Sequence, residues 1–391
     1  MAIDFQTRVH WSFVNHLNRG VEMETGFLWH EKLMWHDPGS AAAGFVPIDG
    51  SFQPGLHVEN TETKRKLKNL LDAYDVTPQL RQLDFEPATM EILRRFHTVD
   101  YIERVRQLSD SRGGDAGDTA PVGPGSELIA RMAVGATCAG MASVLKGEVN
   151  NSYILSRPPG HHAERDRGRG FCIYNNIGLA IMEARAKGLV DRVAVVDWDV
   201  HHGNGTQQAF YDSPDVLTIS LHQEMLYPAN MGKLSEQGEG NGEGFNINVP
   251  LPAGCGGEAY LAAMEQVVVP ALRHFKPELI VVACGYDASY FDPMSHMLLI
   301  SSHYRQMTEI MMKLSDELCD GRLVVNHEGG YSEFYVPFCG AAVIEAISGI
   351  ESGIVDPSRA TAFVENQLLK PHQQAQIDAA VNGPLQRCLQ G

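Results

Sequence analysis

The chain has 391 residues, of which 44% are hydrophobic, so it is long enough to bury a large core. Its formal net charge of −17 argues against a duplex-DNA-binding protein, because such a protein needs a basic stripe to displace counterions. We find no signal-peptide pattern and expect no membrane-spanning stretch, so we predict a cytoplasmic protein without a membrane or nucleic-acid partner. The seven cysteines form no Cys-x-x-Cys pair, which predicts reduced thiols.

The first 150 residues divide into an irregular arm and a helical region. Residues 1–60 are rich in aromatic side chains, His, Gly and Pro, with a cluster at Trp29–Asp37. This cluster is either a packed irregular arm or a wall of a binding site, since long ordered loops are often functional. Residues 60–110 and 126–145 are predicted to be helical, and residues 111–125 form a Gly/Asp/Pro loop.

From residue 152 onward, predicted strands and helices alternate. Alternation of this kind predicts a parallel sheet with helices on both faces. The predicted strands lie near 152–156, 192–198, 215–221, 245–249, 278–284 and 322–326. The predicted helices lie near 175–188, 204–211, 257–275, 302–319 and 338–349.

Two carboxylates and an imidazole follow the strand at 192–198. Asp197, Asp199 and His201 occupy every second position, and in an extended chain such side chains share one face. Open α/β sheets bind their ligands at the carboxyl ends of strands. Carboxylate and imidazole together are typical ligands of a divalent transition metal. In isolation these residues would more often cap the next helix or lie solvated in a loop.

Three other predicted strands end in chemically capable residues. His161 and His162 follow the first strand, Asp287 follows the fifth, and Tyr331 follows the sixth after a Gly-Gly turn. Each of these residues alone would more often be packing or surface. Together, Asp199, His201 and Asp287 make three metal ligands with an open fourth position, as in catalytic zinc sites. The histidine pair can move a proton and the tyrosine can donate to an oxyanion, which suits hydrolysis of an amide.

Five ordered motifs resemble those of the histone deacetylase superfamily. They are Arg-Pro-Pro-Gly-His-His-Ala at 157–163, Gly-Phe-Cys at 170–172, Asp-Trp-Asp-Val-His-His-Gly-Asn-Gly-Thr at 197–206, Gly-Tyr-Asp-Ala at 285–288 and Glu-Gly-Gly-Tyr at 328–331. The match is to the class II-like bacterial amidohydrolases, which include acetylpolyamine amidohydrolases. The resemblance implies one catalytic domain over residues 1–391, with the motif-bearing core at about 20–350, an N-terminal arm at 1–20 and a C-terminal tail at 356–391.

The resemblance also implies an arginase-like α/β fold with a central eight-stranded parallel sheet, and it assigns roles to individual residues. One Zn²⁺, with Fe²⁺ as the alternative, would bind Asp199, His201 and Asp287. The catalytic groups would be His161, His162 and Tyr331, with Asp197 bonded to His161 and Asn204 orienting His162. A structural K⁺ would be held by Asp197, Asp199, His201, Ser220 and Leu221. The substrate tunnel would be lined by Gly170, Phe171, Tyr227 and Asp118.

Three positions refine this assignment. Asn204 stands where class I enzymes have Asp, so His162 lies beside a neutral amide whereas His161 has an anionic partner. We therefore predict that His162 is the neutral base and His161 the more cationic imidazole. Gly203 stands where arginase has a further carboxylate ligand, which favours one catalytic metal. Asp292 precedes a proline and is predicted to be a turn residue.

The sequence therefore predicts a zinc-dependent amidohydrolase that deacylates an N-acyl amine of the acyl-lysine or acetylpolyamine type. One alternative is a hydrolase of small free-standing amides, including xenobiotic amides. A second alternative is a non-catalytic acyl-lysine-binding module, which would be expected to have lost Tyr331 or a metal ligand. The predicted partners are a small-molecule or peptide amide and further copies of the chain in a dimer or tetramer. We expect the Trp29–Asp37 cluster to narrow the mouth of the tunnel and to disfavour folded histones as substrates.

Overall fold

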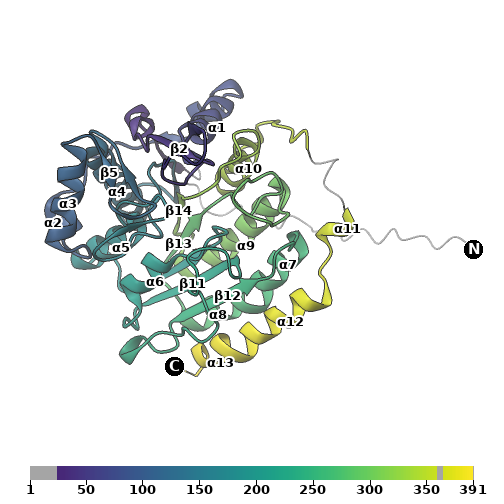
Figure 1. The fold of residues 1–391 in the computed structure, drawn as a ribbon. Coiled ribbons are helices and arrows are strands. Elements are labelled where there is room, and N and C mark those ends of the chain that lie inside the picture. Colours follow the sequence, from purple (N-terminus) through teal and green to yellow (C-terminus); the bar gives the residue numbers. More distant parts are fainter. Residues whose placement is uncertain (1–23, 359–363, 391) are drawn as a thin grey trace, which may run out of the picture.

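The computed structural model describes residues 24–358 and 364–390, and its centre is an eight-stranded sheet (Figure 1). All neighbouring strands pair in parallel, in the order β12-β11-β10-β13-β14-β8-β1-β4. In chain order these strands are β1 (Thr25–Leu28), β4 (Arg81–Gln82), β8 (Asn151–Ile154), β10 (Val193–Asp197), β11 (Val216–Gln223), β12 (Asn246–Leu251), β13 (Leu279–Cys284) and β14 (Leu323–His327). The predicted parallel α/β sheet is confirmed. The predicted arm at 1–20 lies outside the described residues.

Six of these strands were predicted to within two residues of their ends, and two were missed. β1 has four residues and lies in the segment expected to be irregular. β4 has two exposed residues and lies in the segment expected to be helical. Runs this short show no periodicity of their own. They become strands because β8 presents a free edge, on which β1 pairs, and β4 then pairs on β1.

The sheet is buried on both faces by helices. Along β10, Ala194 and Val196 belong to one hydrophobic cluster while Val193 and Val195 belong to another, as the period-two alternation of a strand requires. The first cluster packs against α1 (Glu62–Ala73), α7 (Gly257–Ala263), α8 (Val269–Phe275), α9 (Ser301–Cys319) and α10 (Val336–Ser348). The second packs against α4 (Ser126–Leu145), α5 (Asn176–Ala186) and α6 (Asn204–Phe210), and α2 (Met90–Leu93) and α3 (Val99–Ser109) lie outside these.

Helix α4 corrects the expectation that no stretch of the chain is long and apolar enough to span a membrane. Its 20 residues are long and apolar enough to cross a membrane by length and composition. In the structure most of the helix is buried, and it packs on α5 and on strand β8. The apolar run is therefore explained by its position between the sheet and other helices, where water is excluded from nearly its whole circumference.

The C-terminal tail forms helices along one edge of the sheet. Helix α11 (Val364–Gln367) is followed by α12 (Pro371–Ala380) and α13 (Gln386–Cys388). Figure 1 shows α12 and α13, in yellow, beside edge strand β12, and Ile377 and Ala380 of α12 are buried in the main core. The tail thus covers an edge strand whose free backbone groups would otherwise be open to pairing.

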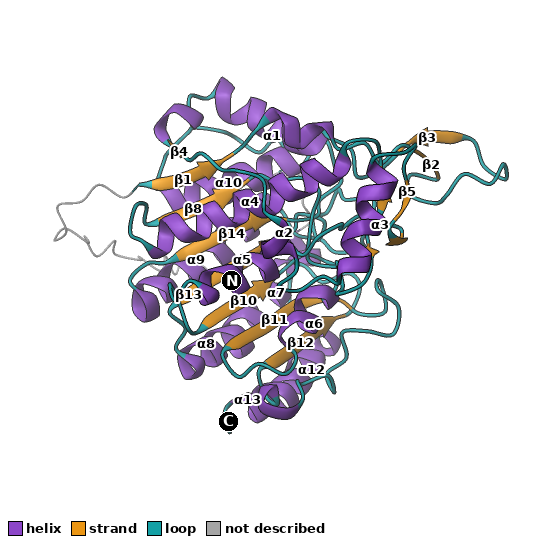
Figure 2. Cartoon of the chain, turned by 90° about the vertical axis from the view of Figure 1, so that its left-hand side faces the viewer, coloured by secondary structure: helices purple, strands orange, loops and turns teal. Residues whose placement is uncertain are grey.

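Long loops and small strand pairs gather at the carboxyl ends of the large sheet. The hairpin β2 (Ser40–Ala42) and β3 (Pro54–Leu56) projects from this side of the domain (Figure 2). Shorter pairs join β5 (Gly114–Asp115) to β7 (Pro121–Val122), and β6 (Gly117–Asp118) to β9 (Gly168–Arg169). Loops next to these strands contribute Phe45, Thr119 and Gly170 to the lining of the cavity described below. The seven cysteines are free thiols, as predicted.

A buried neutral histidine, His97, forms hydrogen bonds to the backbone of two loop residues, Glu164 and Asn175. Its Nδ1 donates to the carbonyl of Glu164 at 3.0 Å, and its Nε2 accepts from the amide N–H of Asn175 at 3.0 Å. This pair of bonds requires the neutral ring, and burial lowers the pKa of His97 to about 3.

We expect this histidine to make the protein less stable in mild acid. Its pKa is depressed in the folded state, so only the unfolded chain takes up the proton as the pH falls below about 6.5. The stabilisation is complete above that pH and is lost at up to about 1.4 kcal/mol per pH unit toward pH 3. Urea midpoints at pH 7, 6 and 5 should fall less steeply for His97→Gln than for the parent protein. Equal slopes for the two proteins would contradict the assignment.

Candidate active site

Four adjacent strands deliver the motif residues to one place. In the sheet order, β10, β13, β14 and β8 are consecutive neighbours. Each is followed at its carboxyl end by part of the predicted set. These parts are Asp197 to His201 after β10, Asp287 after β13, Glu328 to Tyr331 after β14, and His161 with His162 after β8. Segments up to 170 residues apart in the chain therefore meet at one edge of the sheet, as expected for an open α/β fold.

Two carboxylates converge on one imidazole nitrogen. His201 Nδ1 lies 3.2 Å from Asp199 Oδ1 and 3.0 Å from Asp287 Oδ2. The other oxygen of each carboxylate is held from behind, by the N–H of Gly329 on Asp199 (2.8 Å) and of Val200 on Asp287 (2.8 Å). Asp199 Oδ1 also accepts from the His201 N–H at 3.0 Å, and this oxygen and Asp287 Oδ2 both face His201 Nδ1. All three side chains are buried.

This donor set fits a divalent cation. Burying two carboxylates costs free energy unless positive charge compensates them. Although burial opposes it, hydrogen bonds to the two acids raise the pKa of His201 to about 10, which shows how strongly the pocket attracts a positive charge. A tetrahedral ion with bonds of about 2.0–2.1 Å would have ligand-to-ligand separations of about 3.3 Å, close to the spacings here. One ligand atom from each of the three residues lies within 4.8 Å of the other two.

Glycines let the backbone approach this centre. A Cβ on Gly329 would lie 2.5 Å from Asp287 Oδ2 and 2.6 Å from Asp199 Oδ2, so a larger residue cannot be accommodated without displacing a ligand. A Cβ on Gly203 would collide with Asp197 Oδ2. The position at which arginase carries another carboxylate is thus sterically closed in this chain.

The two histidines of the 157–163 motif have different partners. His161 Nδ1 lies 3.0 Å from Asp197 Oδ2, and His162 Nδ1 lies 2.8 Å from Asn204 Oδ1, the contacts that the resemblance implies. Burial works against a charged His161, but Asp199 and Asp197 outweigh it and raise its pKa to about 10. Burial, and then the neighbouring His161 and His201, hold the pKa of His162 well below its usual value. The difference between the pKa values of His161 and His162 has the direction predicted from the sequence.

Tyr331 presents its hydroxyl beside the metal ligands. A Cβ built on Gly329 would lie 3.2 Å from this hydroxyl and 2.5 Å from Asp287 Oδ2, which places the two groups on the same side of the turn. Burial, and then the charges of Asp287 and Asp199, raise the pKa of Tyr331 well above its usual value. The phenol therefore keeps its proton at neutral pH and can donate a hydrogen bond to an acceptor.

Asp292 anchors this tyrosine. One of its oxygens accepts from the Met294 N–H at 2.9 Å, which is the turn contact expected from sequence. The other accepts from the N–H groups of Tyr331 (2.7 Å) and Ser332 (3.2 Å). The interpretation as a turn residue was thus incomplete, because the second pair of bonds crosses to a loop 39 residues away in the chain.

An apolar cavity of about 330 Å³ leads to these groups. Gly170, Phe171 and Tyr227, which were predicted to line a substrate tunnel, line this cavity together with His162, His201 and Tyr331. Asp118 does not line it, which corrects the prediction; its carboxylate instead accepts from Arg169 (3.0 Å) and lies 3.4 Å from the Tyr227 hydroxyl. The lining residues that sequence reasoning missed are Phe45, Thr119, Leu226, Pro293, Met294 and His296.

The wall at Phe171 is held in an unusual backbone conformation. Its φ is +68°, a region that side chains other than glycine and asparagine rarely adopt. The Phe171 N–H donates to the Thr119 carbonyl at 2.8 Å, and the ring packs edge-on against Tyr331 with centroids 5.7 Å apart. The strained residue therefore places its ring against Tyr331.

The expectation that the Trp29–Asp37 cluster narrows the mouth of the cavity is wrong. No residue of this cluster lines the cavity, and Phe45 in the following β2–β3 loop does so instead. His30 to Trp35 form a short 3-10 helix, η1 (Glu31–Trp35), with its cap, and this helix packs on α4. The sequence offered no signal for Phe45, because its place at the mouth depends on how the hairpin folds over the sheet.

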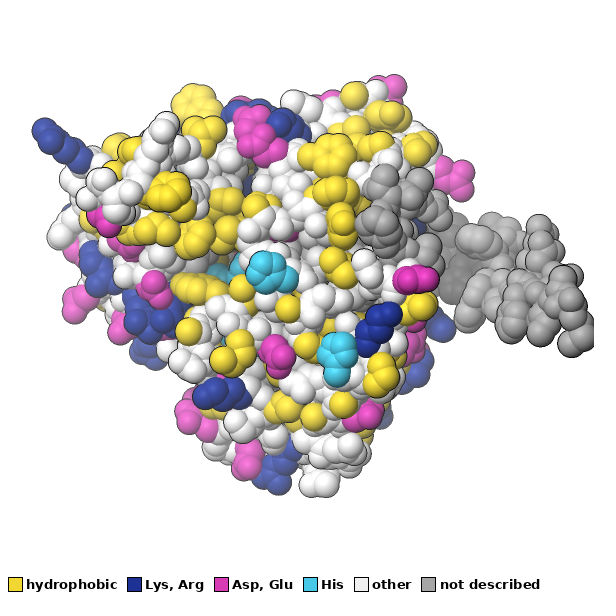
Figure 3. Space-filling view, turned by 45° about the vertical axis from the view of Figure 1, so that its right-hand side comes forward, with side chains coloured by type: hydrophobic (Ala, Val, Ile, Leu, Met, Phe, Trp, Pro, Cys, Tyr) yellow, Lys and Arg dark blue, Asp and Glu magenta, His cyan; other side chains and the backbone are white. Residues whose placement is uncertain are grey.

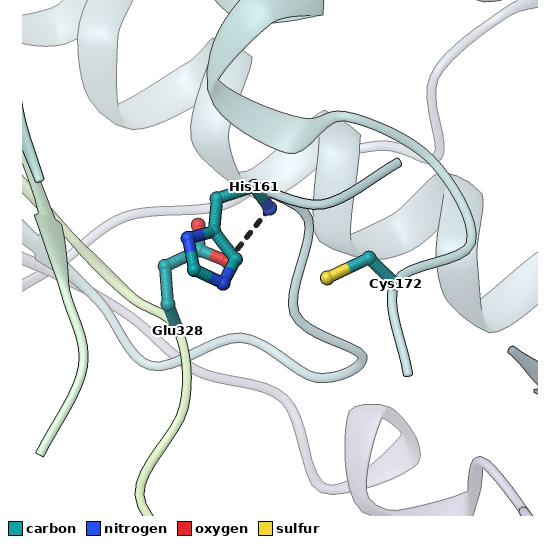
Figure 4. A group of neighbouring side chains, drawn as sticks. All are labelled: His161, Cys172 and Glu328. Atoms are coloured by element: carbon teal, nitrogen blue, oxygen red, sulfur yellow. Dashed lines mark hydrogen bonds between the residues drawn. The ribbon is translucent and has the colours of Figure 1, made fainter. Parts of the chain in front are cut away.

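A second cluster, of His161, Cys172 and Glu328, supports the site (Figure 4). Glu328 accepts from the N–H groups of Gly160 (2.6 Å) and His161 (3.1 Å) through one oxygen, and from the Asn326 amide (2.8 Å) through the other. Its carboxylate is thereby committed to anchoring the backbone of the histidine pair. Burial raises the pKa of the Cys172 thiol well above its usual value, which disfavours the thiolate that metals bind.

Comparison with known proteins identifies the family. A model of the histone deacetylase domain matches residues 57–347. The chain belongs to the histone deacetylase family. It is 49% identical over 346 residues to a histone deacetylase-like amidohydrolase of Pseudomonas aeruginosa, covering 88% of this chain and 90% of that one.

More distant histone deacetylase relatives agree. The chain is 37% identical to histone deacetylase 8 of Arabidopsis thaliana over 84% of this chain and 89% of that one. It is 34% identical to a probable deacetylase of Archaeoglobus fulgidus over 86% and 89%. A crystal structure of the HDA15 HD domain superimposes with a TM-score of 0.79 at 29% identity, covering 93% of this chain and 96% of that one. This histone deacetylase family member is accordingly a metal-dependent hydrolase of amide bonds, and the alternative of a non-catalytic binding module is set aside.

Proposed function

We propose that this enzyme is a zinc-dependent deacylase of N-acyl amines, of the acyl-lysine or acetylpolyamine type. The observation that carries the proposal is the convergence of three buried ligands, a neutral imidazole and a protonated phenol at the end of one apolar cavity. Each group has a place in amide hydrolysis: the ligands hold the cation, the imidazole moves the proton, and the phenol stabilises the oxyanion.

Asp199, His201 and Asp287 would hold one Zn²⁺ or Fe²⁺. When bound, the cation supplies a Lewis acid that activates water and polarises the substrate carbonyl. The proposed structural K⁺ would lie with Asp197, Asp199, His201, Ser220 and Leu221. Its support is that Asp197 and Ser220 are paired in register on β10 and β11 and border a void of about 10 Å³.

The side chains of this enzyme would divide the remaining work. His162 Nδ1 donates to Asn204 Oδ1, which leaves Nε2 free to take the proton of the attacking water and to return it to the leaving amine. His161, paired with Asp197, would remain cationic and favour negative charge on the reacting carbonyl. Tyr331 would donate a hydrogen bond to that oxygen.

The cavity favours slender substrates. It is mainly apolar, with Phe171 and Tyr227 as walls and Phe45 at the mouth, so an extended alkyl chain or a small acyl group fits its chemistry. On the face seen in Figure 3, basic side chains are scattered among acidic ones rather than joined in a stripe. Together with the net charge of −17, this argues against stable association with chromatin.

We expect small N-acyl amines and flexible acyl-lysine peptides to outperform folded histones. Steady-state kcat/KM should be compared for acetylputrescine, an acetyl-lysine peptide, a small free amide and an acetylated nucleosome. A clear preference for the free amide would favour the alternative, a hydrolase of small or xenobiotic amides. A nucleosome preferred by a wide margin at physiological salt would contradict the small-substrate proposal.

A variant of Phe45, with a matched control, tests the role of the cavity entrance in substrate binding. Phe45→Ala should change KM for the peptide more than for the small free amide, because Phe45 lies at the cavity entrance, 39% exposed. Trp35→Ala is the control, since Trp35 is exposed but does not line the cavity. The cytoplasmic location, the dimer or tetramer and the lack of nucleic-acid and membrane partners stay predictions from the sequence.

A further inference from the structure

We propose that Glu164 is a positioning residue that fixes the amide of Asn204, and through it the tautomer of His162. The proposal rests on the proposed function, in which His162 is the base. Glu164 is 4% exposed and follows the histidine pair by two residues, yet none of the motifs above includes it. Its role emerges from its hydrogen bonds.

The Asn204 amide is held on both sides. Its Oδ1 accepts from His162 Nδ1 at 2.8 Å, while its Nδ2 donates to Glu164 Oε1 at 2.8 Å and to the His162 carbonyl at 3.3 Å. A carboxylate can only accept, so the amide nitrogen must face Glu164. The amide oxygen must then face His162, whose Nδ1 has to carry the proton. This leaves Nε2 as the unprotonated nitrogen that the proposed function requires.

Flipping the amide would be unfavourable at both ends. The amide oxygen would then meet the Glu164 carboxylate, and the amide nitrogen would meet His162 Nδ1. Two acceptors would face each other in a buried site, and His162 could bond only in the other tautomer, with its proton on Nε2. The His162 carbonyl favours the same orientation through a longer bond of 3.3 Å, so the charged Glu164 at 2.8 Å supplies the stronger of the two restraints.

Glu164 is itself firmly placed. Arg169 Nη1 donates to Oε1 at 2.8 Å and Arg167 Nε donates to Oε2 at 2.7 Å. Two guanidinium groups therefore compensate a charge that would otherwise be costly to bury. Arg169 Nε also donates to the Asp118 carboxylate at 3.0 Å, so one guanidinium group links Glu164 to the loop that carries Asp118.

The contact explains why an amide suits position 204. An aspartate there would direct a second carboxylate at Glu164 across the 2.8 Å now spanned by a hydrogen bond. The two positions should therefore be energetically coupled. Residues in one hydrogen-bond network commonly have coupling free energies that correspond to factors of roughly 2 to 150 in an equilibrium or rate constant. A glutamine at position 164 carries no charge, so it would remove the repulsion between two carboxylates that Asn204→Asp introduces.

A double-mutant cycle tests the proposal, with kcat and KM measured on an acetyl-lysine peptide. Asn204→Asp should lower kcat at least tenfold in the parent enzyme but by less than about threefold in the Glu164→Gln background. Glu164→Gln alone should lose at most about threefold, since its oxygen still accepts from Asn204. Glu164→Leu, which cannot accept, should lose at least tenfold in kcat with little change in KM.

Controls separate this role from general support of the fold. Arg167→Gln removes an ion pair from Glu164 but leaves its contact with Asn204, so the cost of Asn204→Asp should stay as in the parent enzyme. Metal content and melting temperature of every variant should be measured alongside. If Glu164→Leu does not fold, the double-mutant cycle of Asn204→Asp and Glu164→Gln still tests the proposal.

The proposal is overturned if Asn204→Asp costs the same factor in both backgrounds. His162→Ala distinguishes this failure from failure of the proposed function. A His162→Ala enzyme with undiminished kcat would remove the base itself and with it the need for positioning. An inactive His162→Ala enzyme, together with an uncoupled cycle, would refute only the role of Glu164.

Discussion

Replacing Asp199 or Asp287 with alanine is expected to abolish amide hydrolysis. Each carboxylate would supply one of three ligand atoms, and the second oxygen of each is bound by a backbone N–H group. A site with two of the three ligands should bind the cation far more weakly. Activity and metal content by elemental analysis should fall together.

The control for these variants is an exposed aspartate. Asp212→Ala changes the same residue type on the surface and should retain both metal and activity. Chelation of the parent enzyme should abolish activity, and added Zn²⁺ should restore it, but Zn²⁺ should not restore Asp199→Ala. Full turnover by metal-free parent enzyme would refute the mechanism.

Metal binding should also be visible in stability. A ligand that binds only the folded state raises the free energy of unfolding by RT ln(1 + [L]/Kd), which is about 2.7 kcal/mol at a hundredfold excess over Kd. The melting temperature of the metal-free parent enzyme should rise on addition of Zn²⁺. The same addition should leave Asp287→Ala unchanged, which gives a readout that does not depend on turnover.

Replacing Tyr331 with phenylalanine is expected to lower kcat by about 10²–10³ with little change in KM. The ring and its edge-on contact with Phe171 are kept, so the cavity wall should persist. Only the hydroxyl is lost, and its raised pKa shows that it is a protonated donor at neutral pH. Pre-steady-state kinetics under conditions where chemistry limits the rate would measure the effect directly.

Tyr74→Phe is the matched control for this experiment, because Tyr74 lies exposed at the end of α1. Its kcat should equal that of the parent enzyme. Dissociation constants for an unreactive substrate analogue should be similar for the parent and for Tyr331→Phe. If Tyr331→Phe turned over at the parent rate, the tyrosine would have no part in stabilising the oxyanion.

Much of the metal site could be predicted because its residues lie close in sequence to strand ends. The spacing of Asp197, Asp199 and His201, after a β-branched run, indicated both the strand and the chemistry. To predict that Asp287 and Tyr331 lie beside these residues, an additional premise was needed, that the carboxyl ends of parallel strands meet at one edge of the sheet. The observed order β10-β13-β14 supplies it.

The walls of the cavity could be predicted only in part. Gly170 and Phe171 belong to a motif next to the histidine pair and were found, whereas Phe45 and Met294 were missed. Asp118 was placed in the wall although its neighbour Thr119 lines it, because a loop alignment cannot decide which of two successive side chains faces inward. These residues come from long connections whose course depends on what they pack against.

The sequence by itself determined the fold class, the six contiguous strands from β12 to β8 and the identity of the residues that meet at their ends. It could do so because strand periodicity and the chemistry of Asp, His and Tyr are local properties. Only the tertiary structure decided which partner each side chain has. The bond from Asn204 to Glu164, the anchoring of Tyr331 by Asp292 and the place of Phe45 at the mouth all join segments distant in the chain. Such contacts depend on the order of strands and the packing of loops, which no local pattern encodes.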